Sequence, residues 1–279
     1  MYITYDCGGR LGNCIFPFFI CILFEMRFGY TYSEEDHYPQ TTVTDEMFAQ
    51  HVTEEKLLNN QITLPKENLR LWGFFQYDWI FKHFRKEIME YLEKSPRNIC
   101  IMAKSMNHRL SSQKILTDRL PNVNPGPKDV VIHLRLEDNL VTDDINPNGP
   151  RFVFSPHDYD PILKNLEYER IYWVMKAPEH PMEFKYLDYM MKKWGGIYTP
   201  QSLEEDICLM RKAHILVCSR STLSWVSSYL TPHEKQTVFL PLKKINCFYE
   251  QCPGIYPITI PFDYQKCRIQ DLERIMDKE

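Results

Sequence analysis

The chain has few of the features that mark several common protein classes. It carries no long basic stretch, and its 33 Lys and Arg residues against 37 Asp and Glu residues give a net charge of −4. This balance argues against nucleic acid as a main partner. Its apolar run at residues 14–24 falls short of the roughly 20 residues that a membrane-spanning helix needs.

The same apolar run also lacks the surroundings of a signal peptide. Asp6 offsets Arg10 in the stretch before it, and no small-residue cleavage site follows. We therefore expect a buried helix here. The sequence shows no signal peptide, membrane anchor or transmembrane segment, so we expect a cytoplasmic or otherwise soluble protein.

The nine cysteines lack the spacing of a disulfide framework. Cys7, Cys14 and Cys21 recur every seven residues, which suits one face of a helix better than a metal cage. Cys247 and Cys252 have the spacing to form a bridge in an oxidising compartment. We expect free, partly buried thiols in a reducing compartment.

The N-terminal half contains one clear strand–turn–helix unit and less regular segments after it. Residues 30–53 are polar, aromatic and unpatterned, which predicts a long loop. The amphipathic pattern of residues 78–94 predicts a helix. The other predicted elements are strands at 2–6 and 69–75, an apolar helix after the glycine-rich turn 8–13, with Pro17 tolerable only in its first turn, and a helix at 98–120.

The proline-rich segment 121–127 is the clearest linker, and strands alternate with helices after it. Such alternation predicts a parallel sheet covered on both faces. We predict two α/β domains, 1–122 and 123–279. The later predicted strands are 130–136, 171–175, 214–218 and 237–240, and the later predicted helices are 156–166, 182–194, 203–213 and 222–230.

Two polar residues interrupt the strand predicted at 130–136. Val131, His133 and Arg135 share one face of it, although a strand covered on both faces should be apolar on both. His133 and Arg135 lie at its carboxyl end, where ligands of open parallel sheets bind. The planar Arg fork suits a diphosphate. The alternative is an Arg135–Asp138 ion pair with His133 satisfied in the core.

A second candidate is the hydroxyl-rich turn at residues 219–222. Ser219, Arg220, Ser221 and Thr222 stand between a predicted strand and a predicted helix, whose N-terminus attracts phosphate. The alternative is plain N-capping of the helix by the hydroxyl groups.

Two further patterns are weaker. The turn containing Gly9, Arg10, Gly12 and Asn13 allows close backbone approach to a ligand, but it has neither the dinucleotide nor the phosphate-loop spacing. Asp158 and Asp160 have the spacing of metal-binding carboxylates, yet the following Pro161 favours helix capping.

Together these segments resemble the glycosyltransferase family that contains the α-1,2-fucosyltransferases. The resemblance covers about residues 5–230, and the first and central motifs also resemble the protein O-fucosyltransferases. The matching segments are Gly9-Arg10-Leu11-Gly12-Asn13, Gly73-Phe74-Phe75-Gln76, the set His133, Arg135 and Asp138, and the set Ser219, Ser221, Thr222, Ser224 and Trp225.

The resemblance implies a GT-B-like α/β fold of two facing Rossmann-like domains, with the C-terminal domain holding GDP-fucose and the N-terminal domain on the acceptor side. It implies an inverting, metal-independent transfer of fucose to a glycan acceptor, with no cofactor. Arg135 would clamp the β-phosphate, Asn13 would reach the leaving oxygen or acceptor, and His133 would orient Arg135 or the donor. Asp138 is a candidate base. The donor-binding set would be Gly9, Arg10, Gly12, Arg135, Ser219, Arg220, Ser221 and Thr222. Without a membrane stem, such an enzyme would be a bacterial, viral or otherwise cytosolic one.

Several residues depart from the family pattern close to the expected donor site. Leu136 and Glu137 stand where the family has Arg and Gly, Lys176-Ala177-Pro178 replaces Ser-Asp-Asp, and Cys14 and Arg220 replace Gln and Asn. Two alternatives therefore stay open: a metal-dependent transferase of another nucleotide sugar such as a UDP-sugar, and a non-catalytic nucleotide- or carbohydrate-binding protein.

Overall fold

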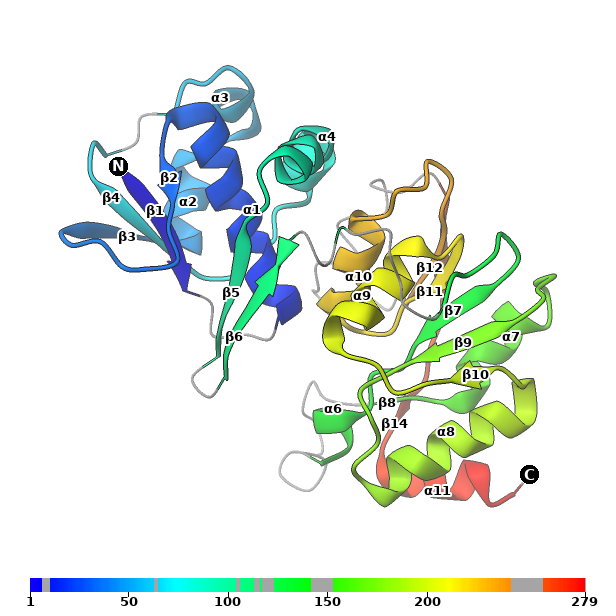
Figure 1. The fold of residues 1–279 in the computed structure, drawn as a ribbon. Coiled ribbons are helices and arrows are strands. Elements are labelled where there is room, and N and C mark those ends of the chain that lie inside the picture. Colours follow the sequence, from blue (N-terminus) through cyan, green and yellow to red (C-terminus); the bar gives the residue numbers. More distant parts are fainter. Residues whose placement is uncertain are drawn as a thin grey trace. The chain divides into compact units, whose positions relative to one another are not determined.

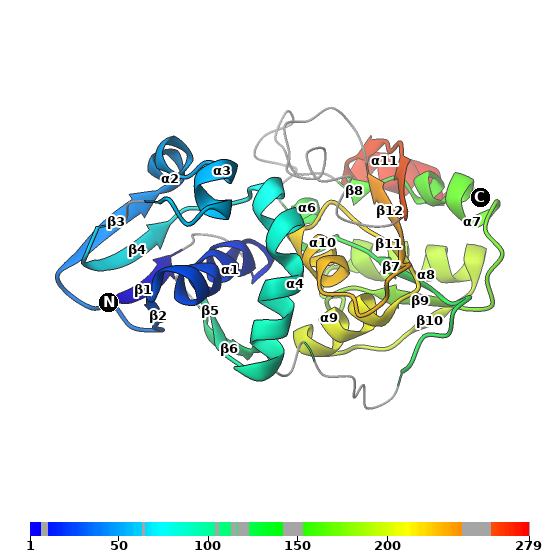
Figure 2. The same ribbon diagram turned by 90° about the horizontal axis from the view of Figure 1, so that it is seen from above.

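The computed structural model describes residues 1–6, 11–62, 65–103, 106–112, 116, 123–141, 153–241 and 258–278. The chain divides into two compact units, Met1–Thr117 and Asp118–Glu279. Each unit combines helices with a parallel sheet (Figure 1, Figure 2). The predicted α/β class is thereby confirmed. The division falls a few residues before the predicted one at 122/123, and the acceptor-side and donor-side roles of the two units stay predictions.

The first unit is built on a four-stranded parallel sheet in the order β2–β1–β4–β3. The apolar face of this sheet packs against α1, whose residues from Cys14 to Phe24 are all buried. The elements are β1 (Tyr2–Asp6), α1 (Leu11–Phe28), β2 (Thr31–Tyr32), β3 (Gln40–Thr44), α2 (Asp45–His51), α3 (Glu54–Leu58), β4 (Asn68–Trp72), α4 (Asp78–Lys94) and the antiparallel hairpin β5 (Asn98–Ala103) and β6 (Met106–Ser111).

Three predictions for this unit are wrong. The segment expected as a loop at 30–53 contains β2, β3 and α2, because Thr44 caps α2 and Phe48 is buried against rings outside the segment. The helix expected at 98–120 begins instead as the β5–β6 hairpin, since paired strands satisfy its backbone groups. Pro17 lies in the second turn of α1, and the helix continues through it.

The cysteines differ from the expectation at one position. Cys14 is disulfide-bonded. The expectation of free thiols is therefore wrong at Cys14, whereas Cys21, Cys218 and Cys267 are buried thiols. Among the described helices, none is long and apolar enough to cross a membrane.

The second unit contains a six-stranded parallel sheet in the order β10–β9–β7–β11–β12–β13. Its strands are β7 (Val130–His133), β9 (Ile171–Val174), β10 (Ile197–Tyr198), β11 (Ile215–Val217), β12 (Thr237–Pro241) and β13 (Ile258–Phe262). Around it lie α6 (Glu137–Val141), the short antiparallel pair β8 (Val153–Phe154) and β14 (Lys266–Cys267), the 3-10 turn Pro156–Tyr159, α7 (Asp160–Leu163), α8 (Pro181–Trp194), α9 (Leu203–Lys212), α10 (Thr222–Tyr229) and α11 (Ile269–Met276).

Helices cover both faces of this sheet. Val130, Ile132 and Trp173 share the core with α8 and α11, while α9 and α10 lie on the opposite side (Figure 1). The chain runs from β7 outward to β9 and β10, then returns to β11 on the other side of β7. The sheet therefore has a topological switch point between β7 and β11, where ligands of such folds bind.

Candidate functional site

The two polar segments singled out from the sequence follow the two strands at this switch point. Ile132 of β7 pairs with Val217 of β11, so residues 133–135 and 219–221 leave the sheet side by side at its carboxyl edge. The structure thus brings together His133, Arg135, Ser219 and Arg220, which are far apart in the sequence.

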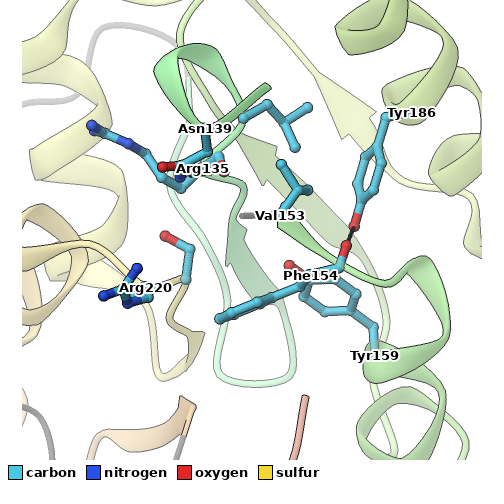
Figure 3. A pocket seen from close by; sticks show the side chains of 9 residues that line it. Arg135, Asn139, Val153, Phe154, Tyr159, Tyr186 and Arg220 are labelled. Atoms are coloured by element: carbon cyan, nitrogen blue, oxygen red, sulfur yellow. Dashed lines mark hydrogen bonds between the residues drawn. The ribbon is translucent and has the colours of Figure 1, made fainter. Parts of the chain in front are cut away.

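Three of them, Arg135, Ser219 and Arg220, line a small hollow. None of its described lining residues is acidic, and two are arginines. The lining residues are Arg135, Leu136, Asn139, Val153, Phe154, Tyr159, Tyr186, Ser219 and Arg220 (Figure 3).

His133 is buried and bonded across the switch point. Its Nδ1 lies 2.8 Å from the Ser219 hydroxyl oxygen, and its side chain is 5% exposed. Burial, helped by the charge of Arg135, lowers the pKa of His133 to about 3. The imidazole is therefore neutral near pH 7, which suits it to positioning neighbouring groups and not to proton transfer.

Arg135 lies beyond the end of β7, not within the strand predicted at 130–136. The amide of Leu134 still bonds to the carbonyl of Val174 at 2.8 Å, after which the chain turns into α6 through Glu137, whose φ is +27°. The carbonyl of Arg135 accepts a hydrogen bond from Asn139 Nδ2 at 3.3 Å. The backbone of Asp138 lies in α6, and its side chain is outside the described part.

The turn after β11 caps α10. Ser221 is the N-cap residue, and its hydroxyl accepts the amide of Leu223 at 3.2 Å. Ser221 therefore caps α10, which is the alternative stated above for this turn. Thr222, half-buried, opens α10, and Arg220 lines the hollow. A guanidinium and a helix N-terminus therefore lie in one turn.

An aromatic wall closes the other side of the hollow. The hydroxyls of Tyr159 and Tyr186 hydrogen-bond to each other (Figure 3), and Tyr186 also donates to the carbonyl of Phe154 at 3.0 Å. Burial raises the pKa of both phenols. The sequence did not single out these three residues, because buried aromatics at such positions resemble ordinary core residues. It did not single out Asn139 either, since no motif contains it.

Asp206 is a buried carboxyl that the sequence analysis also missed. It is 7% exposed in the first turn of α9, and burial, with the nearby Glu205 and Glu137, raises its pKa to about 8. An acidic residue in a first helical turn interacts favourably with the helix dipole. Nothing in the sequence therefore indicated that this carboxyl is buried.

The carboxylates of the proposed metal alternative have other contacts. Asp158 accepts the amides of Ser155 and Gln265 at 2.8 and 2.9 Å. Asp160 pairs with Lys164 and Lys193. These contacts favour the capping interpretation of the segment.

The N-terminal turn is only partly described. Gly9 and Arg10 lie outside the described residues, while Gly12 and Asn13 form the first turn of α1. The amide of Gln76 donates to Asn13 Oδ1 at 3.2 Å. Asn13 and Gln76, which belong to two different segments of the sequence resemblance, therefore meet within the first unit.

No protein-family profile matches the sequence, and a comparison with curated proteins finds no match. Two solved structures align with the chain. POFUT1 in complex with GDP-fucose aligns at 12% identity with a TM-score of 0.40, covering 94% of this chain and 98% of the other. POFUT1 in complex with GDP aligns at 11% identity with a TM-score of 0.39 and the same coverage.

Proposed function

We propose that the protein is an inverting, metal-independent glycosyltransferase that transfers fucose from GDP-fucose to a hydroxyl of a glycan acceptor. The observation that carries the proposal is the placement of Arg135 and Arg220 around one hollow at the β7–β11 switch point. Guanidinium groups form charge-assisted hydrogen bonds with phosphate oxygens, which suits them to a diphosphate. The donor sugar follows from the sequence resemblance.

In this proposal Arg135 binds the β-phosphate of the donor. The acceptor hydroxyl oxygen attacks the anomeric carbon, the bond to the β-phosphate oxygen breaks, and its electron pair leaves with GDP. The guanidinium forms charge-assisted hydrogen bonds to the growing negative charge, each contributing roughly 1.5–3 kcal/mol. Arg220 and the first turn of α10 bind the same diphosphate.

His133 is assigned a positioning role. Because its pKa is about 3, it is a poor base near neutral pH, and its bond to Ser219 ties the end of β7 to the end of β11. Because GDP is a good leaving group, the transfer needs only weak base assistance. Asp138 stays the candidate base, and Asn13 the candidate contact to the leaving oxygen or acceptor.

Nucleotide binding tests the proposal. GDP should raise the unfolding temperature of the protein more than UDP does. Arg135→Ala should abolish the increase, while Arg274→Ala, on the exposed side of α11 in the same unit, should retain it. An equal effect of GDP on Arg135→Ala would refute the clamp.

A chelator distinguishes the proposed function from the metal-dependent alternative. Transfer activity should survive EDTA, and Asp160→Asn should retain it, because the proposal gives Asp160 no metal to bind. Loss of transfer in EDTA, restored by a divalent cation, would favour the UDP-sugar alternative.

A further inference from the structure

The hollow at the β7–β11 switch point has an apolar part as well as its arginines. Leu136, Val153 and Phe154 line it together with Arg135 and Arg220 (Figure 3). Leu136 follows Arg135 in the turn after β7, while Val153 and Phe154 form β8. The structure therefore places an apolar surface and two guanidinium groups around one small space.

The apolar surface is held in place by its own packing. β8 pairs with β14, and the Phe154 ring stacks on Tyr264 at a centroid distance of 4.6 Å. Leu136, Val153 and Phe154 are only 1%, 2% and 4% exposed, so a small part of each is open to the hollow. A ligand group that fits such a preformed surface binds without the entropic cost of ordering it.

The polar side chains that line the hollow, apart from the arginines, bond within the protein. The bonds are those of Tyr159 with Tyr186, of Tyr186 with the Phe154 carbonyl at 3.0 Å, of Ser219 with His133 Nδ1 at 2.8 Å and of Asn139 Nδ2 with the Arg135 carbonyl at 3.3 Å. A hydroxyl group placed against the apolar surface would lose its bonds to water and compete with these bonds for a partner. A methyl group needs no partner and gains from apolar contact.

The proposed donor carries a methyl group close to its diphosphate. In GDP-fucose the anomeric carbon is bonded to an oxygen of the β-phosphate, and the ring oxygen joins that carbon to C5, which bears the methyl group. This methyl group is the one ring substituent of fucose without oxygen, and the small hollow suits a single substituent better than a whole ring. A β-phosphate bound by Arg135 therefore brings the methyl group within reach of Leu136, the next residue in the chain.

We propose that Leu136, Val153 and Phe154 form a methyl pocket that selects a 6-deoxyhexose donor. The pocket holds the C6 methyl group of fucose and disfavours the hydroxyl that an ordinary hexose carries on C6. This inference deepens the proposed function and rests on it for the identity of the donor. It gives the second unit a basis for sugar selection that is separate from the diphosphate contacts of Arg135 and Arg220.

Two donors that differ by one hydroxyl group test the methyl pocket. L-Galactose is L-fucose with a hydroxyl on C6, so GDP-L-galactose and GDP-L-fucose share every contact except the one in the pocket. Calorimetric titration of the full chain should give a dissociation constant about 10- to 100-fold lower for GDP-L-fucose, the range in which apolar pockets discriminate against an added hydroxyl. Both donors make the diphosphate contacts, so the ratio of the two constants does not depend on their strength.

Variants of Val153 assign the selectivity to the pocket. Val153→Thr supplies a partner for the C6 hydroxyl, and Val153→Ala makes room for it, so each should reduce the ratio about tenfold. Val238→Thr places the same hydroxyl at a buried valine of β12 outside the hollow and should keep the ratio of the unchanged protein.

Equal dissociation constants of the two donors for the unchanged protein would overturn the methyl pocket. A ratio retained by both Val153 variants, or lost equally in Val238→Thr, would overturn it as well. Titration with GDP, which carries no sugar, separates these results from failure of the proposed function. If GDP binds while the two donors bind equally, the diphosphate site stands and only the pocket is refuted. If GDP does not bind to the unchanged protein, both are refuted.

Discussion

Glu137 stands at the turn that aims Arg135, and its backbone has φ +27°. Glycine adopts such angles without steric cost, whereas a residue with a Cβ does not. The chain therefore keeps a strained residue next to the proposed diphosphate clamp.

Replacing Glu137 by glycine should relieve this strain. We expect Glu137→Gly to raise the free energy of unfolding by about 1 kcal/mol, the lower end of the cost of such a backbone. Glu137→Ala removes the same carboxylate but keeps the Cβ, so it should not give this gain. Urea unfolding of the two variants measures the difference, and equal stabilities would contradict the strain.

Asp206 should make stability depend on pH. Its pKa rises from an ordinary 3.8 to about 8 in the folded chain, so the folded state keeps a proton that the unfolded state loses above pH 4. Stability is therefore lost as pH rises from about 4 to about 8. Asp206→Asn has no such proton. Its free energy of unfolding should therefore rise relative to that of the unchanged protein across this window and then level off.

Urea unfolding at pH 5, 6.5 and 8 measures the Asp206 effect. Glu204→Gln, in the same first turn of α9 but half-exposed, is the matched control and should show little pH dependence relative to the unchanged protein. A constant difference between Asp206→Asn and the unchanged protein at the three pH values would contradict the raised pKa.

Residues differed in how well the sequence revealed them. His133 and Arg135 were found because polar side chains interrupt an apolar strand, and that contrast is visible in one dimension. Tyr186 and Asp206 were missed because their significance comes from burial and from neighbours distant in the chain. A tyrosine on an apolar helix face or an acid in a first helical turn is unremarkable until the tertiary contacts are known.

At the scale of elements, α1 carries a disulfide at Cys14, in its first turn beside Asn13. Bridges of this kind persist in oxidising surroundings. Since the chain has nine cysteines, and since Cys14 and its partner account for two, at most seven should react with a thiol reagent in the denatured, unreduced protein.

Prior reduction should expose all nine thiols and lower the unfolding temperature. Removing a native disulfide costs roughly 2–5 kcal/mol in small domains. Cys14→Ser should titrate one thiol more than the unchanged unreduced protein, because it releases the partner. Nine reactive thiols in the unreduced, unchanged protein would contradict the bridge.

Amphipathic elements were predicted well and paired ones poorly. The helix predicted at 78–94 coincides with α4, because its apolar residues recur at helical spacing. The β5–β6 hairpin was mistaken for a helix, since Ile99 and Ile101 give only a short alternating pattern and the pairing partner lies further along the chain. The strands of residues 40–44 and 31–32 escaped detection for the same reason, as their partners are β4 and β1.

At the scale of the whole molecule, each unit has a parallel sheet with a switch point, between β1 and β4 in the first and between β7 and β11 in the second. The sequence predicted parallel sheets from strand–helix alternation, but strand order depends on crossovers that leave no local pattern. Strand order is what joins His133 to Ser219 and Trp72 to the end of β1. The proposed diphosphate site lies at the switch point of the second unit.

The most direct test of the central claim is the rate of fucose transfer from GDP-fucose by Arg135→Ala, with the unchanged protein and Arg274→Ala measured alongside. The acceptor is a glycan that the unchanged protein fucosylates. Loss of the paired charge-assisted bonds should lower kcat/KM about 10²- to 10⁴-fold, with Arg274→Ala unaffected. Transfer by Arg135→Ala at the rate of Arg274→Ala would contradict the diphosphate clamp on which the account rests.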